Sequence, residues 1–395
     1  MQISSLLTLN SVKSLKKLMD SQKEIYLYGA GYYLEFFLQE IENLDKAYYD
    51  KIKCIFVSNA DGSPEKVRGI PVFTYYPDTL GANDCVLLTL GHRYTDEVFR
   101  LLQGTGAHIA EIDFNMFQEI PYHEVKKSIT SFLAVFPERL SGLNVPLPQN
   151  GIVAWTCWWQ GEEQAPEIVR ACLESQRKNL PYGVKHVVIT ENNYQDYITL
   201  PEYILKKVKA GNISLTTLSD IIRAALLYKY GGFWMDSTLL VCKPLDRSIL
   251  DYPFYTRNLP ETHCCSNAMW SGWFLYTRPG SKLFCFLMES FFYYFSMYSK
   301  IKYYFMIDYL IAIASNTFRD IEEQLKAVPY NNEGAQELIR HITEPFVPEN
   351  MAVYIKNSSI QKLSYKISLT EIDEPGSTIY GHIIKEYCCE PLNCK

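Results

Sequence analysis

Short apolar runs alternate with amphipathic helical stretches through the first third of the chain, and this rhythm restricts the fold more than any other feature. Four strand-like runs are expected, at residues 25–28, 53–57, 86–90 and 108–112. Helical spacing follows the first and the third of them, at 33–41 and 96–102. Strands that alternate with helices predict a parallel sheet, because each parallel connection has to cross over the sheet. The chain is therefore expected to begin with an α/β domain.

A tight turn, Gly29-Ala30-Gly31, joins the first predicted strand to the first predicted helix. Such a turn suits a Rossmann-like sheet, in which a nucleotide phosphate approaches the helix N-terminus. Leu34 stands where the third small residue of G-x-G-x-x-G would be, and Val57-Ser58-Asn59 lacks the acidic residue that would bind a ribose. Two interpretations stay open: a turn that binds no ligand, and the seat of a nicotinamide cofactor.

Prolines divide the chain into two predicted domains. They stand among mixed polar residues, at Pro121, Pro137, Pro146 and Pro148. Residues 1–120 are therefore predicted to form the Rossmann-like domain, and 121–148 a linker with some helix. Beyond it, a strand-like run, a helical stretch and a second strand-like run predict another α/β domain over 149–395. Open α/β sheets bind ligands beyond the carboxyl ends of their strands.

Composition and charge exclude several classes of protein. The 38 basic and 44 acidic side chains give a formal charge of −6, which disfavours a nucleic-acid partner. The 11 cysteines are scattered and odd in number, unlike a disulfide framework. The first 20 residues do not resemble a secretory signal, and no 18 apolar residues run together. We therefore expect a cytoplasmic protein.

The most informative stretch is residues 218–240, LSDIIRAALLYKYGGFWMDSTLL. Ser219 is expected to cap a buried helix, and Gly231 to end that helix. The trio Phe233-Trp234-Met235 then predicts a short buried strand, with Asp236 at its end. The stretch therefore places an acidic side chain where a strand leaves the sheet.

Three charged side chains of this stretch are predicted to meet at one cleft. Asp220 and Arg223 stand three residues apart, on one face of the predicted helix. The start of that helix and the end of the strand that carries Asp236 can open onto the same site. Two structural interpretations remain: a simple ion pair between Asp220 and Arg223 near a helix N-terminus, and an Asp236 that merely caps a turn.

The ordered combination S-D-x-x-R, L-Y-K-Y-G-G, an apolar trio and D-x-T resembles the DXD-bearing sugar transferases of the GT-A fold. In particular, it resembles the bacterial capsular polysaccharide synthesis glycosyltransferases. Other stretches fit in the same order: Trp155-x-x-Trp158-x-Gln160-Gly161, Ala165-Pro166, Cys172, Asn193-Tyr194-x-x-Tyr197, Leu200-Pro201-x-Tyr203-Ile204, Gly211-x-Ile213-Ser214, Ile307-Asp308-Tyr309 and Lys362-Leu363-x-Tyr365-Lys366. The resemblance covers residues 150–370. The N-terminal segment separately resembles small Rossmann-like modules attached to sugar-modifying and sugar-transferring enzymes.

The resemblance implies an α/β chain whose second domain is a GT-A type glycosyltransferase. It implies a nucleotide-diphosphate-sugar donor, a UDP-sugar, and a saccharide or lipid-linked glycan acceptor whose hydroxyl receives the sugar. Asp220 and Arg223 would contact hydroxyls of the donor sugar, and Ser219 would lie near the nucleotide. Trp155 would lie at the strand end that holds the base, and Asp236 would be the first residue of the metal-associated motif.

The second acidic position of the D-x-D motif is Thr238 here, so the role of a metal stays open. A divalent Mn or Mg ion could bind Asp236, donor phosphates and water, because both ions prefer oxygen ligands. Without such an ion, Lys362 and Lys366 are candidates to neutralise the leaving diphosphate, and their structural alternative is two solvated lysines.

The stereochemical course of the transfer depends on a base. Inversion needs a carboxylate base near the acceptor, for which Asp308 is the candidate. A structural hydrogen bond beneath the neighbouring aromatic residues is the alternative role for Asp308. Related DXD transferases generally retain the anomeric configuration, and retention is expected here.

An aromatic block at residues 284–305 completes the pattern. It predicts a helix that faces the core, and the alternative is a surface that touches the inner membrane, where lipid-linked glycans reside. Three functions remain distinct. A glycosyltransferase is the leading hypothesis, followed by a nicotinamide-dependent sugar oxidoreductase or epimerase, and by a noncatalytic glycan-binding protein.

Overall fold

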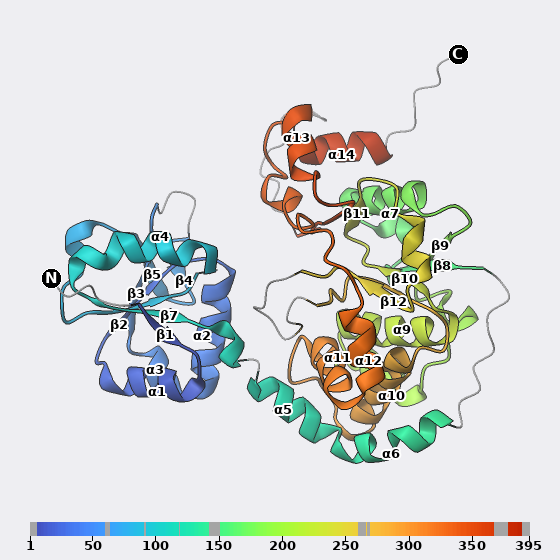
Figure 1. Ribbon diagram of the computed structural model, residues 1–395, viewed down its shortest axis with the longest axis horizontal. Coiled ribbons are helices and arrows are strands. Elements are labelled where there is room, and N and C mark those ends of the chain that lie inside the picture. The colour runs from blue at the N-terminus through green and yellow to red at the C-terminus, as the bar shows by residue number, and fades with distance from the viewer. Residues whose placement is uncertain are drawn as a thin grey trace. The chain divides into compact units, whose positions relative to one another are not determined.

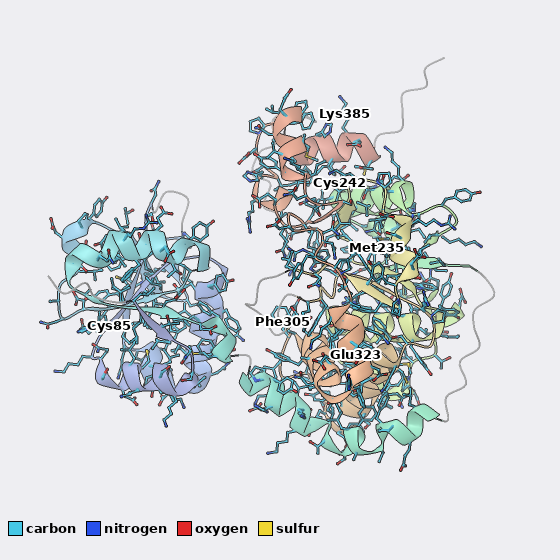
Figure 2. The ribbon with its side chains drawn as sticks, viewed as in Figure 1. Cys85, Met235, Cys242, Phe305, Glu323 and Lys385 are labelled. Atoms are coloured by element: carbon cyan, nitrogen blue, oxygen red, sulfur yellow. The ribbon has the colours of Figure 1, made fainter. Side chains whose placement is uncertain are left out.

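In the computed structural model, the chain forms two compact units, Met1–Pro121 and Tyr122–Lys395. The structure describes residues 6–59, 64–90, 92–117, 119–141, 151–259, 266, 269–366 and 378–388. Both units combine sheets rich in parallel strands with surrounding helices, so the predicted α/β fold class is confirmed (Figure 1). Each unit has its own hydrophobic core, with Cys85 inside the first and Met235 inside the second (Figure 2).

The first unit contains a seven-stranded sheet in the order β1-β7-β6-β2-β3-β5-β4. Its strands are β1 (Leu7–Leu9), β2 (Ile25–Tyr28), β3 (Ile52–Val57), β4 (Lys66–Val67), β5 (Ile70–Thr74), β6 (Cys85–Leu88) and β7 (His108–Ile112). Every neighbouring pair is parallel except β4 with β5. The chain builds outward from β2 through β3 to β5 and then returns to the other side of β2 at β6. This reversal is the doubly wound, Rossmann-like arrangement that the sequence predicted.

Helices cover both faces of this sheet (Figure 1). They are α1 (Val12–Ser21), α2 (Tyr32–Leu44), α3 (Lys46–Tyr49) and α4 (His92–Leu102). Leu15 of α1 and Phe37 of α2 pack in one core with Leu27, whereas Leu102 of α4 packs in a second core with Val86. Alternate residues of the strands thus serve opposite faces, which follows from the period of two in a strand.

The turn after β2 is explained by packing within this unit. Gly29 has φ +109°, and a Cβ added there would lie 2.3 Å from Leu90 Cδ2. The hydroxyl of Thr89 donates to the carbonyls of Tyr28 and Gly29 at 3.0 and 2.8 Å. The loop after β6 therefore presses on the turn, and only glycine fits at position 29.

The second unit is built on a five-stranded sheet in the order β12-β13-β10-β8-β9. Its strands are β8 (Val153–Cys157), β9 (Lys185–Ile189), β10 (Gly232–Met235), β12 (Phe254–Thr256) and β13 (Phe274–Thr277). The strands β9, β8 and β10 are parallel, and β13 runs antiparallel to β10 and to β12. This mixed sheet is consistent with a GT-A type of fold. A separate two-stranded ladder joins β11 (Leu239–Val241) to β14 (Ile360–Lys362).

Helices enclose this sheet on both sides. They are α7 (Glu167–Asn179), α8 (Glu202–Lys209), α9 (Leu215–Tyr230), α10 (Lys282–Met297), α11 (Met306–Thr317), α12 (Arg319–Lys326), α13 (Pro348–Tyr354) and α14 (Ile379–Cys388). The helices α9, α10 and α11 share the large core with the sheet, and α7 and α14 share a second core. From Leu283 to Phe295 most side chains of α10 are buried, so the predicted core-facing helix is confirmed up to Met297. Residues 298–305, predicted to continue it, lie beyond the helix, and Tyr298 and Tyr304 are exposed. Among the described residues, no helix is both long enough and apolar enough to cross a bilayer.

Much of the segment expected to be a linker is packed helix. The helices α5 (Glu119–Ser128) and α6 (Thr130–Ser141) occupy it up to residue 141, and residues 142–150, with Pro146 and Pro148, lie outside the described residues. Phe132 and Phe136 lie four residues apart and are buried in the core of the second unit, with Ile129 one turn before. This helical spacing of apolar side chains explains why the segment packs instead of forming an open connection.

One glycine of the second unit allows β10 to pair with β8. Gly232 has φ +86°, and a Cβ added there would lie 2.0 Å from the carbonyl oxygen of Val153. Gly211 has a similar φ of +71° but nothing within 4 Å of its added Cβ. Both positions therefore have a positive φ, and they differ in the space available.

We expect Gly232→Ala to destabilise the second unit more than Gly211→Ala. The positive φ costs about 1–2 kcal/mol in both variants, and forcing β8 aside adds about 2 kcal/mol or more in Gly232→Ala alone. Chemical denaturation followed by far-ultraviolet circular dichroism measures the difference. Equal losses in the two variants would contradict the close approach of β8 and β10.

Candidate active site

The helix α9 carries two of the predicted site residues, Asp220 and Arg223. It begins earlier than the sequence predicted, because Ser214 is its cap and accepts a hydrogen bond from the Thr217 amide at 3.1 Å. The prediction that Ser219 caps this helix is wrong. Leu215 to Leu218 continue the helical spacing toward the N-terminus, so Ser219 lies in the second turn. There its side chain is within hydrogen-bonding reach of the Cys157 thiol.

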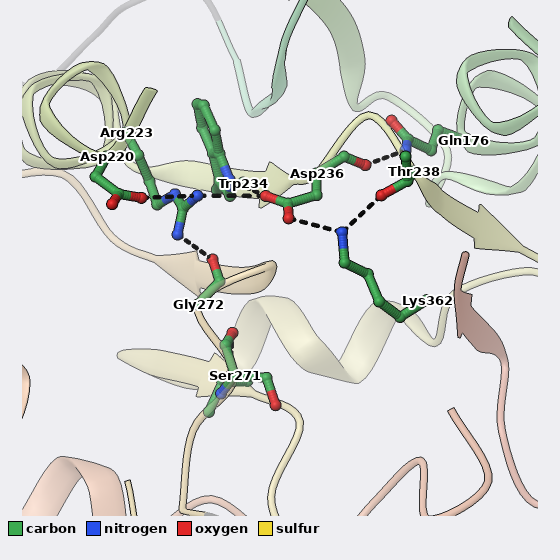
Figure 3. Close-up of polar contacts among 10 residues, drawn as sticks. Gln176, Asp220, Arg223, Trp234, Asp236, Thr238, Ser271, Gly272 and Lys362 are labelled. Atoms are coloured by element: carbon green, nitrogen blue, oxygen red, sulfur yellow. Dashed lines mark hydrogen bonds and ion pairs between the residues drawn. The ribbon is translucent and has the colours of Figure 1, made fainter. Parts of the chain in front are cut away.

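The guanidinium of Arg223 joins three segments of the second unit (Figure 3). Its Nη1 donates to the Gly272 carbonyl at 2.6 Å, and its Nη2 lies 3.2 Å from Asp220 Oδ1 and 3.3 Å from Asp236 Oδ1. The guanidinium carbon is 4.7 Å from the centroid of a Trp234 ring, so the planar group also stacks on an aromatic face. Only 8% of the side chain is exposed. A buried charge of this kind needs such partners to offset the loss of water.

Asp236 follows β10 directly and divides its two carboxylate oxygens between different donors. Oδ1 accepts hydrogen bonds from Trp234 Nε1 at 3.0 Å and from Arg223. Oδ2 accepts from Lys362 Nζ at 2.9 Å, and the same ammonium donates to Thr238 Oγ1 at 2.6 Å (Figure 3). Asp220, Arg223, Asp236 and Lys362 therefore form a row of alternating charges. The sequence predicted that the first three side chains would meet, but not this order.

Lys362 reaches this row through the ladder between β11 and β14. The register pairs Leu239 with Lys362, and the amide of Leu363 donates to the Thr238 carbonyl at 2.9 Å. The D-x-T turn and the lysine are thus fixed by the same backbone hydrogen bonds. The sequence named Lys362 as a candidate but gave no sign of this pairing.

The sequence analysis did not identify Gln176, a buried polar residue that contacts the D-x-T turn. Gln176 of α7 donates from Nε2 to the carbonyls of Asp236 and Leu239, at 3.0 and 2.8 Å. Its Oε1 lies 2.8 Å from Thr156 Oγ1 and 2.9 Å from His186 Nε2. Burial lowers the pKa of His186 to about 4, so the imidazole is neutral near pH 7. The available signal was a glutamine on the apolar face of the predicted helix, three and four residues after apolar positions.

Two carboxyl groups of the site titrate differently. Burial raises the pKa of Asp220 to about 7, in spite of Arg223, and the charges of Asp308 and Asp236 add to this increase. Burial would also raise the pKa of Asp236, but Lys362 and Arg223 outweigh it and hold that pKa below its usual value. Asp236 is therefore an anion near pH 7, whereas Asp220 is poised between its two forms.

Two further predictions are not matched by the geometry. Trp155 lies in the middle of β8, not at the strand end, and is 1% exposed with Nε1 donating to the Gly231 carbonyl at 2.9 Å. The prediction for its position is wrong, because its ring packs into the core against Tyr197 and Tyr230. Lys366 is exposed and lies beside the Tyr365 ring, which fits the alternative of a solvated lysine.

The candidate base Asp308 lies in the first turn of α11 and accepts a hydrogen bond from Trp270 Nε1 at 2.9 Å. Burial raises the pKa of its carboxyl group, against the effects of Trp270 and Arg223. The structural hydrogen bond that the sequence left as an alternative is thus present.

The residues that could hold a divalent metal ion are few. Asp236 supplies one carboxylate at the motif, and both of its oxygens already accept from nitrogen donors. In the described parts of the chain, no three histidine, cysteine, aspartate or glutamate side chains are grouped to bind a metal ion. With Lys362 in this position, the site does not fit the cation that a D-x-D motif implies.

The chain matches a known protein family over most of its length. A family model described as capsular polysaccharide synthesis protein matches residues 109–383. The match therefore includes the whole row from Asp220 to Lys362. No curated protein matches the chain.

We expect the stability of the protein to depend on pH through the titration of Asp220. Its folded pKa lies above the unfolded value of about 3.9, so the folded state holds the proton more tightly between pH 4 and 7. The resulting stabilisation is lost as the pH rises toward 7. The charges that face Asp220 are Arg223, Asp236 and Asp308. As the pH rises from 5 to 8, the melting temperature of the wild type should therefore fall relative to that of Asp220→Asn. A difference between the two proteins that stays constant over this range would contradict the raised pKa.

Proposed function

Because the chain belongs to the family of capsular polysaccharide synthesis proteins, we propose that it is a glycosyltransferase of bacterial surface polysaccharide synthesis. It transfers a sugar from a nucleotide-diphosphate-sugar, a UDP-sugar, to a hydroxyl of a saccharide or lipid-linked glycan acceptor. The observation that carries this proposal is the row of charges at the carboxyl end of β10, in which Asp236 joins Arg223 to Lys362.

The chemistry of a sugar donor fits the order of charges along this row. The hydroxyls of a sugar donate hydrogen bonds to carboxylates and accept them from a guanidinium, which suits Asp220 and Arg223. A diphosphate needs a cation beside it, and the Lys362 ammonium stands at the other end of the row. The donor therefore lies with its sugar toward α9 and its diphosphate toward β14.

Two alternative functions receive less support. A nicotinamide-dependent enzyme would use the turn after β2, but contact with Leu90 already explains the glycine at position 29. A noncatalytic glycan-binding protein could recognise sugars with exposed polar and aromatic side chains. Such binding does not require a guanidinium like that of Arg223, which is 8% exposed and paired with two carboxylates.

Exposed aromatic rings near the row suit a saccharide acceptor. Tyr304 is 68% exposed, and Asp220, Asp236 and Tyr365 lie close enough to add to the effect of burial in raising its pKa. Tyr365 is half-exposed, and its ring meets that of Trp158 edge to face at 5.4 Å. The face of a tyrosine ring packs well against the C–H groups of a sugar. We therefore assign Tyr304 and Tyr365 to the acceptor side of the site.

The proposed course of the reaction retains the anomeric configuration. The bond from the anomeric carbon to the phosphate oxygen breaks, and its electron pair stays on that oxygen. The acceptor oxygen then bonds to the same face of the anomeric carbon, and its proton passes to the departing phosphate. Asp308, the candidate base for inversion, accepts a hydrogen bond from Trp270 at Oδ1, and the retaining course does not need this carboxylate as a base.

We expect Asp236→Asn to lower the rate of UDP-sugar hydrolysis at least tenfold. The amide keeps the size of the side chain but removes the charge that joins Arg223 to Lys362, and the loss of one charged contact costs about 2 kcal/mol. A screen of UDP-sugars by thermal shift identifies the donor for the assay. Asp196→Asn, the same change at an exposed site, is the control and should hydrolyse the donor like the wild type. An unchanged rate in Asp236→Asn would contradict the proposed site.

We also expect Tyr304→Ala to raise the KM for the saccharide acceptor about fivefold, which corresponds to the loss of about 1 kcal/mol of ring packing. Steady-state transfer at saturating donor measures this change. Tyr182→Ala, at a ring that is 93% exposed, is the matched control. An equal acceptor KM in the two variants would contradict the position of the acceptor.

A further inference from the structure

We propose that the ammonium of Lys362 takes the place of the divalent cation, so that sugar transfer by this protein needs no metal ion. The inference rests on the proposed glycosyltransferase function and names the group that neutralises the departing diphosphate. It starts from the position of one nitrogen atom. Lys362 Nζ lies 2.9 Å from Asp236 Oδ2 and 2.6 Å from Thr238 Oγ1, between the first and third side chains of the D-x-T motif (Figure 3).

A divalent ion and this ammonium compete for the same oxygen atoms. Mg²⁺ binds its oxygen ligands at about 2.1 Å, so an ion on Asp236 Oδ2 would lie close to Lys362 Nζ and be repelled by it. The other oxygen, Oδ1, is occupied by Arg223 and Trp234. At the third position of the motif, Thr238 offers a neutral hydroxyl in place of a carboxylate. Each of these contacts favours the lysine over a metal ion.

One N–H group of the Lys362 ammonium stays available to a phosphate. An ammonium group has three N–H donors, and Asp236 and Thr238 take two of them. The side chain is 23% exposed, so the nitrogen is held by the protein and still reachable from the site. We assign the third N–H to an oxygen of the donor diphosphate.

The transfer step balances without a metal ion. When the bond from the anomeric carbon to the phosphate oxygen breaks, negative charge grows on that oxygen, and the N–H of Lys362 donates a hydrogen bond to it. The acceptor oxygen bonds to the anomeric carbon, and the acceptor proton moves to the phosphate. Lys362 is an ammonium before and after the step, so it stabilises the negative charge without losing or gaining a proton.

The surroundings hold this ammonium in place before the donor arrives. The ladder of β11 and β14 fixes the backbone of Lys362, and Gln176 holds the carbonyls of Asp236 and Leu239. A hydrogen-bond donor that already points at the developing charge stabilises a transition state more than a hydrogen-bond donor that has to reorient. The fixed lysine is therefore suited to catalysis as well as to binding.

The first experiment measures metal binding without any donor. Mn²⁺ alone is titrated into the full-length protein and followed by electron paramagnetic resonance. We expect the wild type to bind no Mn²⁺ at the motif, and the double variant Lys362→Met with Thr238→Asp to bind one equivalent. An equivalent of Mn²⁺ bound by the wild type and lost in Asp236→Asn would overturn the inference. This readout stays informative even if the protein proves not to be a glycosyltransferase.

The second experiment measures UDP-sugar hydrolysis in EDTA and in Mn²⁺. We expect the wild-type rate to be the same in EDTA and in Mn²⁺. The hydrolysis rate of Lys362→Met should be lower by at least about 100-fold, as after the removal of one hydrogen-bond donor from an oxyanion hole. Lys362→Arg, which keeps the charge, should recover part of this loss, and Lys356→Ala, at an exposed lysine before β14, should behave like the wild type.

The outcomes of the two experiments separate the two proposals. Wild-type hydrolysis that EDTA abolishes and Mn²⁺ restores would overturn the role of Lys362 and leave the glycosyltransferase function standing. If no UDP-sugar is bound or hydrolysed under either condition, the proposed function fails, and the Mn²⁺ titration alone decides whether the lysine excludes the metal ion.

Discussion

The buried guanidinium of Arg223 is the charge on which the candidate site of the second unit depends. It would be costly to remove from water without partners, and its partners come from three places: Asp220 in α9, Asp236 after β10 and the Gly272 carbonyl before β13. Pairing the two terminal nitrogens of one arginine therefore connects a helix, a strand end and a loop. The site takes its shape from this requirement.

The two carboxylates beside Arg223 differ because their surroundings differ. Burial raises the pKa of both carboxyl groups. At Asp236 the two cations Lys362 and Arg223 outweigh it, whereas at Asp220 only Arg223 opposes it and Asp308 adds to it, so Asp220 holds its proton more tightly. Pairs of acidic groups whose pKa values are pushed apart can take different roles in one site. Here Asp236 is an anion between two cations, and the pKa of Asp220 lies near 7.

The parts of the site that the sequence predicted correctly are those set by local spacing. The apolar residues of α9, the buried trio of β10 and the three-residue step from Asp220 to Arg223 are all readable within a few residues. The start of α9 was missed because Ser214 and Ser219 are both plausible caps, and only the observed amide contact distinguishes them. Trp155 was misplaced because the apolar run of β8 does not show where the strand ends.

The contacts that complete the site join residues far apart in the chain, and local patterns cannot predict them. Lys362 and Thr238 are 124 residues apart, and their meeting depends on the register of a two-stranded ladder. At the position where a D-x-D motif has its second carboxylate, this register brings the Lys362 ammonium to the Thr238 hydroxyl. A D-x-D pair with a divalent cation and a D-x-T pair with an ammonium both sum to zero charge. With a hydroxyl at position 238, the Asp236 carboxylate and the Lys362 ammonium balance each other's charge.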